Sequence, residues 1–210
     1  MNRLTEHFVR NSTPVFSQAD VAVSIGGSDY SRHGLIKRAM ASGEILNIRR
    51  GLYCLAEPYR KKPISVYSIS QHVYGPSYVS LETALSYHGW IPEAVFACTC
   101  ASYHNAKEFD TPLGVFSYKR VPQKAFFTAV ERCVDQNTNV FFMASPVKAL
   151  ADYVYVRRLT WTGIDAAIGS LRIEPEQLTA VDAQALTELA DNCSNGRVRR
   201  FLNSWHEALT

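Results

Sequence analysis

The first third of the chain alternates hydrophobic and polar positions with the periods of short helices and then of a β-hairpin. Helical spacing covers residues 4–9, 19–24 and about 30–42. Ser17 suits the N-cap of the second helix, and Ser28 or Asp29 that of the third, because a short side-chain oxygen can accept a free helical N–H. Gly26 and Gly27 supply the turn between these two helices.

The third predicted helix divides its apolar and basic side chains between two faces. Spacings of one, three and four residues bring together Leu35, Ile36, Ala39 and Met40. Largely outside that face lie Arg32, His33, Lys37 and Arg38. After Gly43, residues 44–49 and 52–55 alternate as two strands around an Arg50–Gly51 turn. The pattern therefore predicts a small hairpin with a basic tip.

The remainder of the chain mixes helical and strand patterns, with the helices concentrated late. Residues 64–73 and 81–88 are predicted helices, the second capped by Ser80 and closed by Gly89. Residues 95–100 and 115–121 are predicted strands. Residues 125–134 fit either type, but the turn-rich stretch 135–139 favours a hairpin with a strand at 140–143. Helical patterns dominate from residue 146, and the last forms an apolar stripe of Val198, Phe201, Leu202, Trp205 and Leu209.

These elements predict an α+β protein of two domains. The charged stretch Glu57–Pro63 is bracketed by prolines and does not suit the interior of a helix or a central strand, so we interpret it as a linker. Helix, helix, turn, helix and hairpin is the order of a winged helix-turn-helix, which we assign to residues 1–60. Residues 64–210 are expected to form a mixed α/β domain ending in helices.

Composition narrows the class of protein. The chain has 210 residues, of which 47% are hydrophobic and 20% charged, as in globular proteins. No apolar run approaches the roughly 18 residues that span a bilayer. Residues 1–11 lack the hydrophobic core of a signal peptide, so we expect a cytoplasmic protein without a membrane partner. The five cysteines have no repeated spacing, which favours reduced thiols over a disulfide framework.

The net charge of +3 is unevenly distributed along the chain. Residues 1–62 hold ten Lys or Arg against five Asp or Glu, whereas residues 63–210 hold twelve against fourteen. All of the positive excess therefore lies in and beside the predicted winged helix. Such asymmetry suggests that this part of the chain faces a polyanion.

Charge and element order together indicate double-stranded DNA as the partner of residues 1–60. The third helix would enter a major groove, and the hairpin arginines would meet phosphates or a narrow minor groove. The predicted DNA-binding residues are Ser31, Arg32, His33, Lys37, Arg38, Arg49 and Arg50. Two alternatives stay open, namely a winged helix that binds protein and a basic helix face that is merely solvated.

Three segments resemble the AbiEi family of antitoxins and regulators from bacterial phage-defence loci. The first runs from Leu35 to Tyr53 and contains Leu-Ile-Lys-Arg, Ser-Gly-Glu-Ile and Ile-Arg-Arg-Gly-Leu-Tyr. The second is Tyr78–Gly89 and the third is Ala144–Asp152. Their order and spacing carry the resemblance, which covers most of residues 1 to about 155. Val147 departs from the family pattern, where an acidic residue is expected.

The resemblance implies a function in two parts. The winged helix would bind inverted repeats in its own promoter and repress transcription. Residues 64–210 would act as the antitoxin of a type IV toxin–antitoxin (abortive infection) system, opposing a nucleotidyltransferase toxin encoded next door without requiring a stable complex with it. An alternative from another class is a stand-alone winged-helix transcriptional regulator whose second domain binds a ligand or dimerises.

Motifs for catalysis are incomplete, and we predict no enzymatic activity, no cofactor and no metal. Gly27–Ser28 resembles the start of a nucleotidyltransferase site, but the downstream pair of carboxylates that would hold metal ions is missing from the sequence. Cys98 and Cys100 share a strand face but have no second pair at zinc-like spacing. We therefore expect these two thiols to pack in the core.

Two further features are left open. A metal-dependent nuclease could be assembled from residues distant in sequence, such as Asp110, Glu131 and Asp152. Basic residues also open the last predicted helix, where cations oppose the helix dipole: Arg197, Arg199 and Arg200. They form either a solvated face or a second basic patch, for DNA or for an acidic partner such as tRNA.

Overall fold

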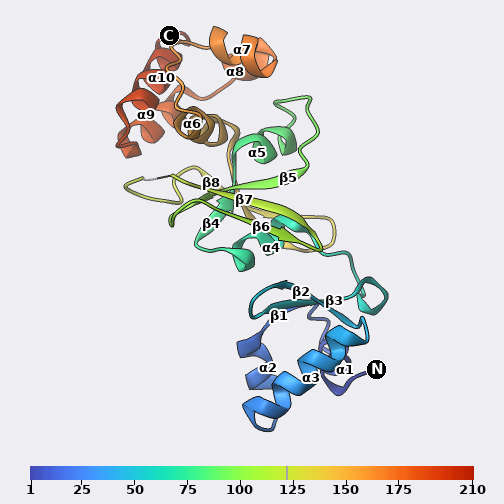
Figure 1. The fold of residues 1–210 in the computed structure, drawn as a ribbon. Helices are drawn as coiled ribbons and strands as arrows, with labels where there is room; N and C mark the ends of the chain where they lie inside the picture. Colours follow the sequence, from blue (N-terminus) through green and yellow to red (C-terminus); the bar gives the residue numbers. More distant parts are fainter. Residues whose placement is uncertain (122) are drawn as a thin grey trace.

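The computed structural model describes residues 1–121 and 123–210, which together form a mixed α+β protein (Figure 1). We refer to residues 1–60 as the N-terminal unit and to residues 64–210 as the second unit. The elements of the N-terminal unit are α1 (Arg3–Arg10), β1 (Val15–Ser17), α2 (Gln18–Ser24), α3 (Asp29–Ala41), β2 (Ile45–Arg49) and β3 (Leu52–Leu55). A 3₁₀ turn, η1 (Glu57–Tyr59), follows within the predicted linker.

Short polar side chains and a glycine set the ends of α2 and α3. Ser17 Oγ accepts from the backbone N–H of Asp20, whose carboxylate accepts from the backbone N–H of Ser17 at 2.6 Å, completing a capping box. Ser28 Oγ accepts from the backbone N–H of Ser31 at 3.3 Å. Gly27 has a φ of +111°, and a Cβ there would lie 2.6 Å from Ser31 Oγ. The helix start predicted at Ser17 is confirmed, and of the two caps predicted for the third helix, Ser28 or Asp29, the structure has Ser28.

The sheet of the N-terminal unit is antiparallel, in the order β1–β3–β2, and is covered on both faces. On one face, Phe16 and Tyr53 join Phe8 of α1 and Ile36 of α3 in a small hydrophobic cluster. On the other face, Leu52 belongs to the larger hydrophobic cluster of the second unit. Every residue of β3 is consequently buried.

The described residues of the second unit form a six-stranded mixed sheet in the order β6–β7–β5–β4–β9–β8. These strands are β4 (Ser77–Val79), β5 (Ala97–Ser102), β6 (Lys107–Thr111), β7 (Gly114–Arg120), β8 (Val130–Val134) and β9 (Val140–Ala144). The pairs β4–β9 and β5–β7 are parallel, and the other pairs are antiparallel. This arrangement agrees with the predicted α+β class.

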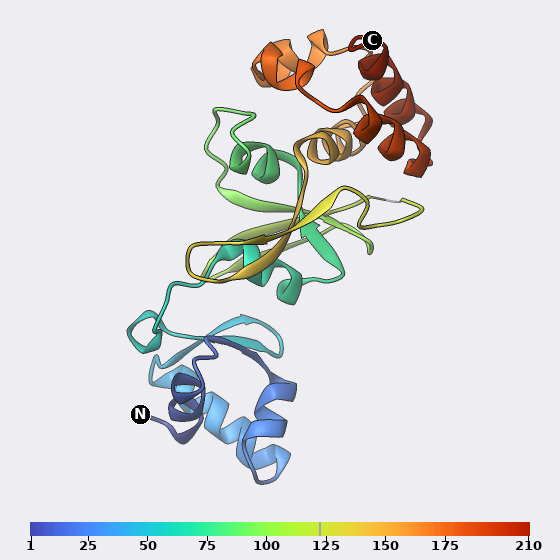
Figure 2. The same cartoon turned by 180° about the vertical axis from the view of Figure 1, so that it is seen from behind.

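Helices cover this sheet on both sides. α4 (Val66–Val73) lies on the side of the N-terminal unit, and α5 (Leu81–Tyr87) and α6 (Pro146–Val156) lie on the far side (Figures 1 and 2). Beyond α6 comes a layer of α7 (Asp165–Leu171), α8 (Pro175–Thr179), α9 (Ala183–Asn192) and α10 (Gly196–Glu207). Among the described residues, no helix combines the length and the apolarity that crossing a bilayer requires.

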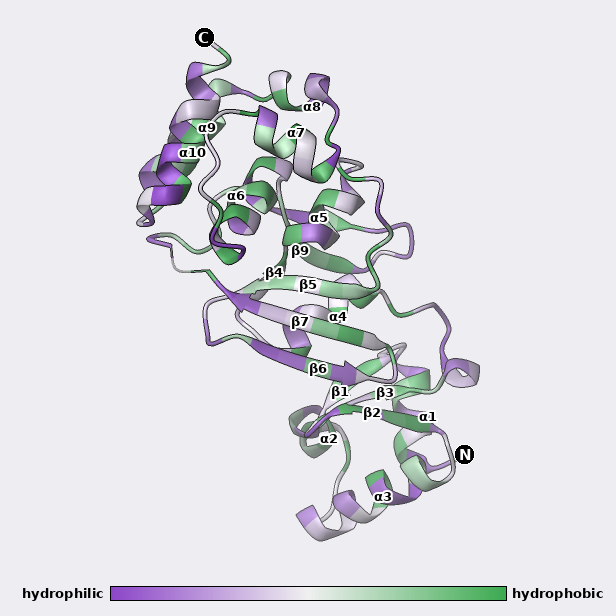
Figure 3. Ribbon diagram, turned by 45° about the horizontal axis from the view of Figure 1, so that its top comes forward, coloured by the Kyte–Doolittle hydropathy of each residue, from purple (hydrophilic) through white to green (hydrophobic). Residues whose placement is uncertain are grey.

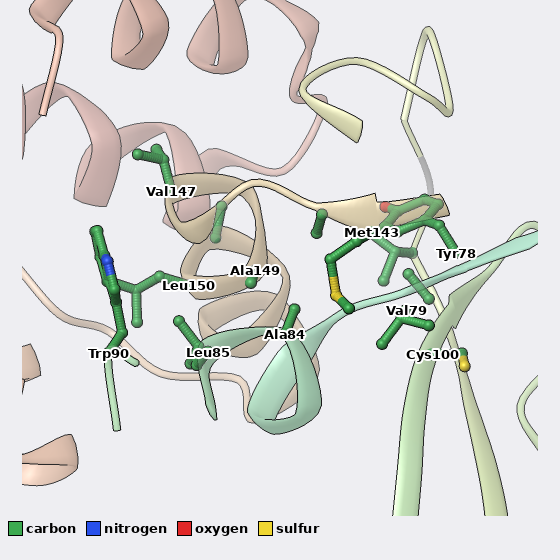
Figure 4. Close-up of a cluster of buried hydrophobic side chains, with 14 of the residues drawn as sticks. Tyr78, Val79, Ala84, Leu85, Trp90, Cys100, Met143, Val147, Ala149 and Leu150 are labelled. Atoms are coloured by element: carbon green, nitrogen blue, oxygen red, sulfur yellow. The ribbon is translucent and has the colours of Figure 1, made fainter. Parts of the chain in front are cut away.

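The contact between α5 and α6 forms the centre of the larger cluster (Figure 4). Ala84 and Leu85 from α5 point toward Ala149 and Leu150 from α6, and Met143 of β9 lies beside them. All five are fully buried. The segments from 78 to 89 and from 144 to 152, which lie far apart in sequence, thus pack side by side.

The hairpin predicted around residues 135–139 and the final helix are confirmed, but the sequence analysis missed three strands. β8 and β9 pair as an antiparallel hairpin, and α10 buries Val198, Phe201, Leu202 and Trp205. The missed strands are β1, β4 and β6. β6 is hydrophilic along most of its length and forms an edge of the sheet (Figure 3).

Candidate nucleic-acid interface

α3 lies on the side of the N-terminal unit that faces away from the second unit (Figures 1 and 2). Its inner positions, Ile36 and Ala39, are buried against the small hydrophobic cluster. Four of the predicted DNA-binding residues are exposed on the rest of its surface: Ser31, His33, Lys37 and Arg38. The exposed surface of this one helix therefore carries two positively charged side chains, a histidine and a hydroxyl group.

Arg32 is placed differently from its neighbours on α3. Its guanidinium folds back to the start of the helix, where it forms an ion pair with Asp29 and donates to the carbonyl of Gly27. The side chain is only 18% exposed. Arg32 stabilises the turn before α3, and it reaches a ligand only if the ion pair with Asp29 opens.

The two hairpin arginines also differ in their surroundings. Arg49 turns toward the second unit, where Nη2 donates to the carbonyl of His72 at 3.0 Å and Nε is buried without a hydrogen-bond partner. A cation near the C-terminal carbonyls of α4 is favourable because of the helix dipole. Arg50, at the turn itself, is exposed. Of the two hairpin arginines, Arg50 is therefore the one that is free to contact DNA in this structure.

Gln18, at the start of α2, connects the hairpin turn to α3. Its backbone N–H donates to the carbonyl of Gly51 at 2.9 Å, and its side-chain Nε2 lies 3.1 Å from Nε2 of His33. His33 is held from its other side, with Nδ1 at 2.9 Å from the carbonyl of Asp29. The hairpin turn and the first half of α3 consequently share one edge of the unit.

Most acidic residues of the N-terminal unit are occupied. Glu6 pairs with Arg10, Asp29 pairs with Arg32, and buried Glu44 accepts from the backbone N–H of Asn2 at 2.8 Å. Hydrogen bonds from Ser17 lower the pKa of Asp20, which therefore stays ionised in its capping box. In the described part of the chain, no ion pair involves Lys37, Arg38 or Arg50. Among the described residues, α3 and the hairpin turn therefore carry three exposed cations without a carboxylate partner.

Sequence reasoning overlooked two residues of this surface. Tyr30 is 90% exposed in the first turn of α3, although an aromatic side chain this exposed is unusual. Its position outside the apolar face of the helix was the available signal. Gln18 was missed because its two contacts join segments that are distant in sequence.

The second unit contains a buried ionic network at the meeting point of two segments that carry the family resemblance. Lys148 Nζ on α6 pairs with Asp152 and donates to the hydroxyl of Tyr78. Tyr78 and Ser80 donate in turn to Oδ2 of Asp152, at 3.0 and 2.8 Å. Lys148 is 0% and Asp152 1% exposed. Burial lowers the pKa of Lys148, and the nearby Asp152 carboxylate opposes that effect.

This network has the character of a structural element. Its four side chains satisfy one another, and burial raises the pKa of Tyr78 well above its usual value. Ser80 stands at the start of α5 as predicted, but it makes no capping hydrogen bond because its hydroxyl donates to Asp152 instead. The network therefore fixes β4 and α5 against α6. A closed network of this kind determines how elements pack without offering a free group to a substrate.

The acids of the nuclease hypothesis lie apart in the structure. Asp110 is on β6 and Glu131 is on β8, at opposite edges of the sheet, while Asp152 is enclosed in its network. Among the described residues, no group of three or more His, Cys, Asp or Glu side chains could hold a metal ion. The thiols of Cys98 and Cys100 lie 3.9 Å apart and are buried. As expected, these two thiols pack in the core.

Comparisons with known proteins bear on the fold. No protein-family model and no curated protein match the chain. The crystal structure of the RV2827C protein from Mycobacterium tuberculosis is similar, with a TM-score of 0.52 and 14% sequence identity over 99% of this chain and 74% of that one. At this identity the likeness concerns the fold alone, which the chain shares along nearly its whole length.

Proposed function

We propose that residues 1–60 form a winged helix-turn-helix that binds double-stranded DNA through α3 and the β2–β3 hairpin. The order of helices and strands and the β1–β3–β2 sheet support this proposal. The observation that carries it is the exposure of Lys37 and Arg38 on α3, the helix that lies on the side of the N-terminal unit away from the second unit (Figure 1). An exposed helix with unpaired cations suits the major groove of DNA.

This proposal assigns a contact with DNA to each of the exposed residues. His33 and Lys37 lie on the first half and the middle of α3, where a recognition helix usually meets base edges. Ser31 and Arg38 flank them and would contact the phosphate backbone or further bases. Arg50 would reach an adjacent phosphate from the hairpin turn.

The binding experiment uses the full chain and a duplex from the region upstream of its own gene. Fluorescence anisotropy at several salt concentrations should give an affinity that falls linearly on a logarithmic scale as salt rises. A duplex of the same length and scrambled sequence should bind more weakly. If neither duplex binds at low salt, the N-terminal unit has another partner, and the protein-binding alternative gains support.

Replacing Arg50 by alanine should weaken binding to both duplexes by a similar factor. A residue that contacts only a phosphate contributes equally to all sequences, and its loss should reduce the slope of log affinity against log salt by about 1. Arg10→Ala is a matched control, because Arg10 is exposed on α1 and already paired with Glu6. An unchanged salt slope for Arg50→Ala would exclude a phosphate contact there.

We further propose that the protein represses its own promoter and that the second unit acts as an antitoxin against a nucleotidyltransferase toxin. This part rests on the family resemblance. Two of the segments that carry the resemblance, 78–89 and 144–152, contribute side chains to the same buried network, which supports a shared structural role for them. The second candidate, a stand-alone regulator, assigns ligand binding or dimerisation to the same unit.

A rescue assay separates these two candidates. The open reading frame adjacent to the gene is expressed in a bacterial host with and without this chain, and growth is scored. Restored growth is expected from the wild type and also from a Lys37→Gln/Arg38→Gln variant, since the antitoxin function is assigned to the second unit. Absence of toxicity, or failed rescue although the protein is made, would leave the regulator as the better interpretation.

A further inference from the structure

A second group of basic side chains surrounds a hollow in the second unit, remote from α3. The hollow has a volume of about 640 Å³, and three of the segments that line it contribute basic side chains. The end of β7 contributes Lys119 and Arg120, and the residues after α6 contribute Arg158. The first turn of α10 adds Arg197, and Tyr155 and Asn195 also line the hollow.

The charge of this hollow is unbalanced. Four of its lining side chains are cationic and none is acidic. In the described part of the chain, none of the four forms an ion pair with a carboxylate. Glu108 is close, but it lines the neighbouring groove beside Lys119. Four like charges around one concave surface repel each other, and a bound anion would relieve that repulsion.

The backbone adds to the positive potential. α10 has 12 residues, and its N-terminal end opens at the hollow, where Asn195 Oδ1 accepts from the backbone N–H groups of Arg197 and Val198. The helix dipole gives this end a partial positive charge, so Arg197 is placed against its electrostatic preference. Arg158 has a φ of +56°, a backbone conformation that favours glycine over arginine. Arg197 is therefore held at a position that the helix dipole does not favour.

We propose that this hollow binds the phosphate groups of a nucleotide or of a nucleic-acid strand. Guanidinium groups match phosphate oxygens in a bidentate geometry, and a helix N-terminus is a common phosphate site. The volume lies within the range of small-ligand pockets. The ring of Tyr155 on the wall offers a surface on which a base can stack. The site is separate from α3 and does not depend on DNA binding there.

Isothermal titration of the full chain at low salt with ATP, and separately with oligouridylate of about 12 nucleotides, tests this proposal. The variant Arg158→Gly/Arg197→Gln removes two lining charges, and glycine suits the backbone of residue 158 without strain. Each lost charge-assisted contact should weaken binding about tenfold, so the double variant should bind about 100-fold more weakly. Thermal denaturation verifies that it is folded.

The matched control is Arg199→Gln/Arg200→Gln. These residues are exposed on the same helix outside the hollow, and the substitution removes the same amount of charge. It should bind either probe within about twofold of the wild type. Tighter binding of ATP identifies a free nucleotide as the ligand, and tighter binding of the oligonucleotide identifies a strand.

Three outcomes overturn the proposal: no binding of either probe by the wild type, undiminished binding by the double variant, or an equal loss in the control. The Lys37→Gln/Arg38→Gln variant keeps this test independent of the proposed function. It should lose promoter DNA while retaining the probe that the hollow binds, so failure at one site is distinguishable from failure at the other.

Discussion

Replacing Asp152 by alanine should lower the free energy of unfolding by about 3–5 kcal/mol, the range found when one partner of a buried ion pair is removed. Asp152 offsets the charge of Lys148 and accepts from Tyr78 and Ser80. Because Lys148 is fully buried, water does not replace the lost partner. A domain is usually stable by only about 5–15 kcal/mol in total, so a large part of the stability is expected to be lost.

Urea denaturation followed by tryptophan fluorescence measures this effect, since Trp90 and Trp205 lie in the hydrophobic core of the second unit. Asp152→Asn is the matched control. It keeps the shape of the side chain and an acceptor for the hydroxyl groups, and it should cost less than alanine. A free energy of unfolding for Asp152→Ala within about 1 kcal/mol of the wild type would contradict a structural role for the network.

This expectation changes how the nuclease hypothesis is tested. Loss of a cleavage activity on changing Asp152 would report unfolding, because the carboxylate is enclosed and fully hydrogen-bonded. Asp110 is the informative position. It lies on the edge strand β6, away from the network, so Asp110→Ala is expected to leave the fold intact.

The network also illustrates what sequence reasoning missed in the second unit. Lys148 and Asp152 are four residues apart, a spacing that usually marks an exposed ion pair on a helix surface. The available signal was their setting, since their helix, Pro146–Val156, is otherwise almost entirely apolar. Their partners Tyr78 and Ser80 lie more than 65 residues earlier in the chain, and a single sequence holds no record of that contact.

Helices were predicted well, and so were the caps at Ser17 and Ser28, because their determinants are local. The cap predicted at Ser80 was wrong, since that hydroxyl donates to the distant Asp152. The capping box at Ser17 and the Ser28 cap involve residues three apart, which the sequence displays directly. The missed strands depend on distant partners instead. β6 has too few apolar residues to show the alternation that identifies a strand in a sequence, and it becomes a strand by pairing with β7. β4 has three residues, all buried between β5 and β9, and so shows no alternation.

The candidate interface was predicted as a set of residues on one helix and one turn, and the structure leaves Lys37, Arg38 and Arg50 exposed there. Arg32 and Arg49 are engaged inside the molecule. The three-residue separation of Asp29 and Arg32 could have indicated their ion pair. The contact of Arg49 with His72 could not have been inferred, because it depends on the packing of the two units.

The combined substitution Lys37→Gln/Arg38→Gln should weaken binding to the promoter duplex by about 2–4 kcal/mol, or roughly 30- to 1,000-fold. Both side chains are exposed on α3 without a carboxylate partner in the described part of the chain. Their removal should therefore subtract DNA contacts while leaving folding unchanged. Anisotropy titrations against the promoter and scrambled duplexes measure the loss, and a thermal melt verifies the fold.

Arg32→Ala decides which part of α3 reads the DNA. Because Arg32 is committed to Asp29 and Gly27, its replacement should change affinity by less than about threefold and should mainly lower stability. If it instead costs about 1–3 kcal/mol and relaxes the preference for one base pair, the ion pair must open on DNA and free Arg32 to contact a base. In that case the first turn of α3 lies at the bases, and Lys37 and Arg38 contribute mainly to phosphate contacts. A larger loss for Lys37→Gln than for Arg32→Ala on the promoter, with a smaller difference on the scrambled duplex, would assign base reading to the middle of the helix.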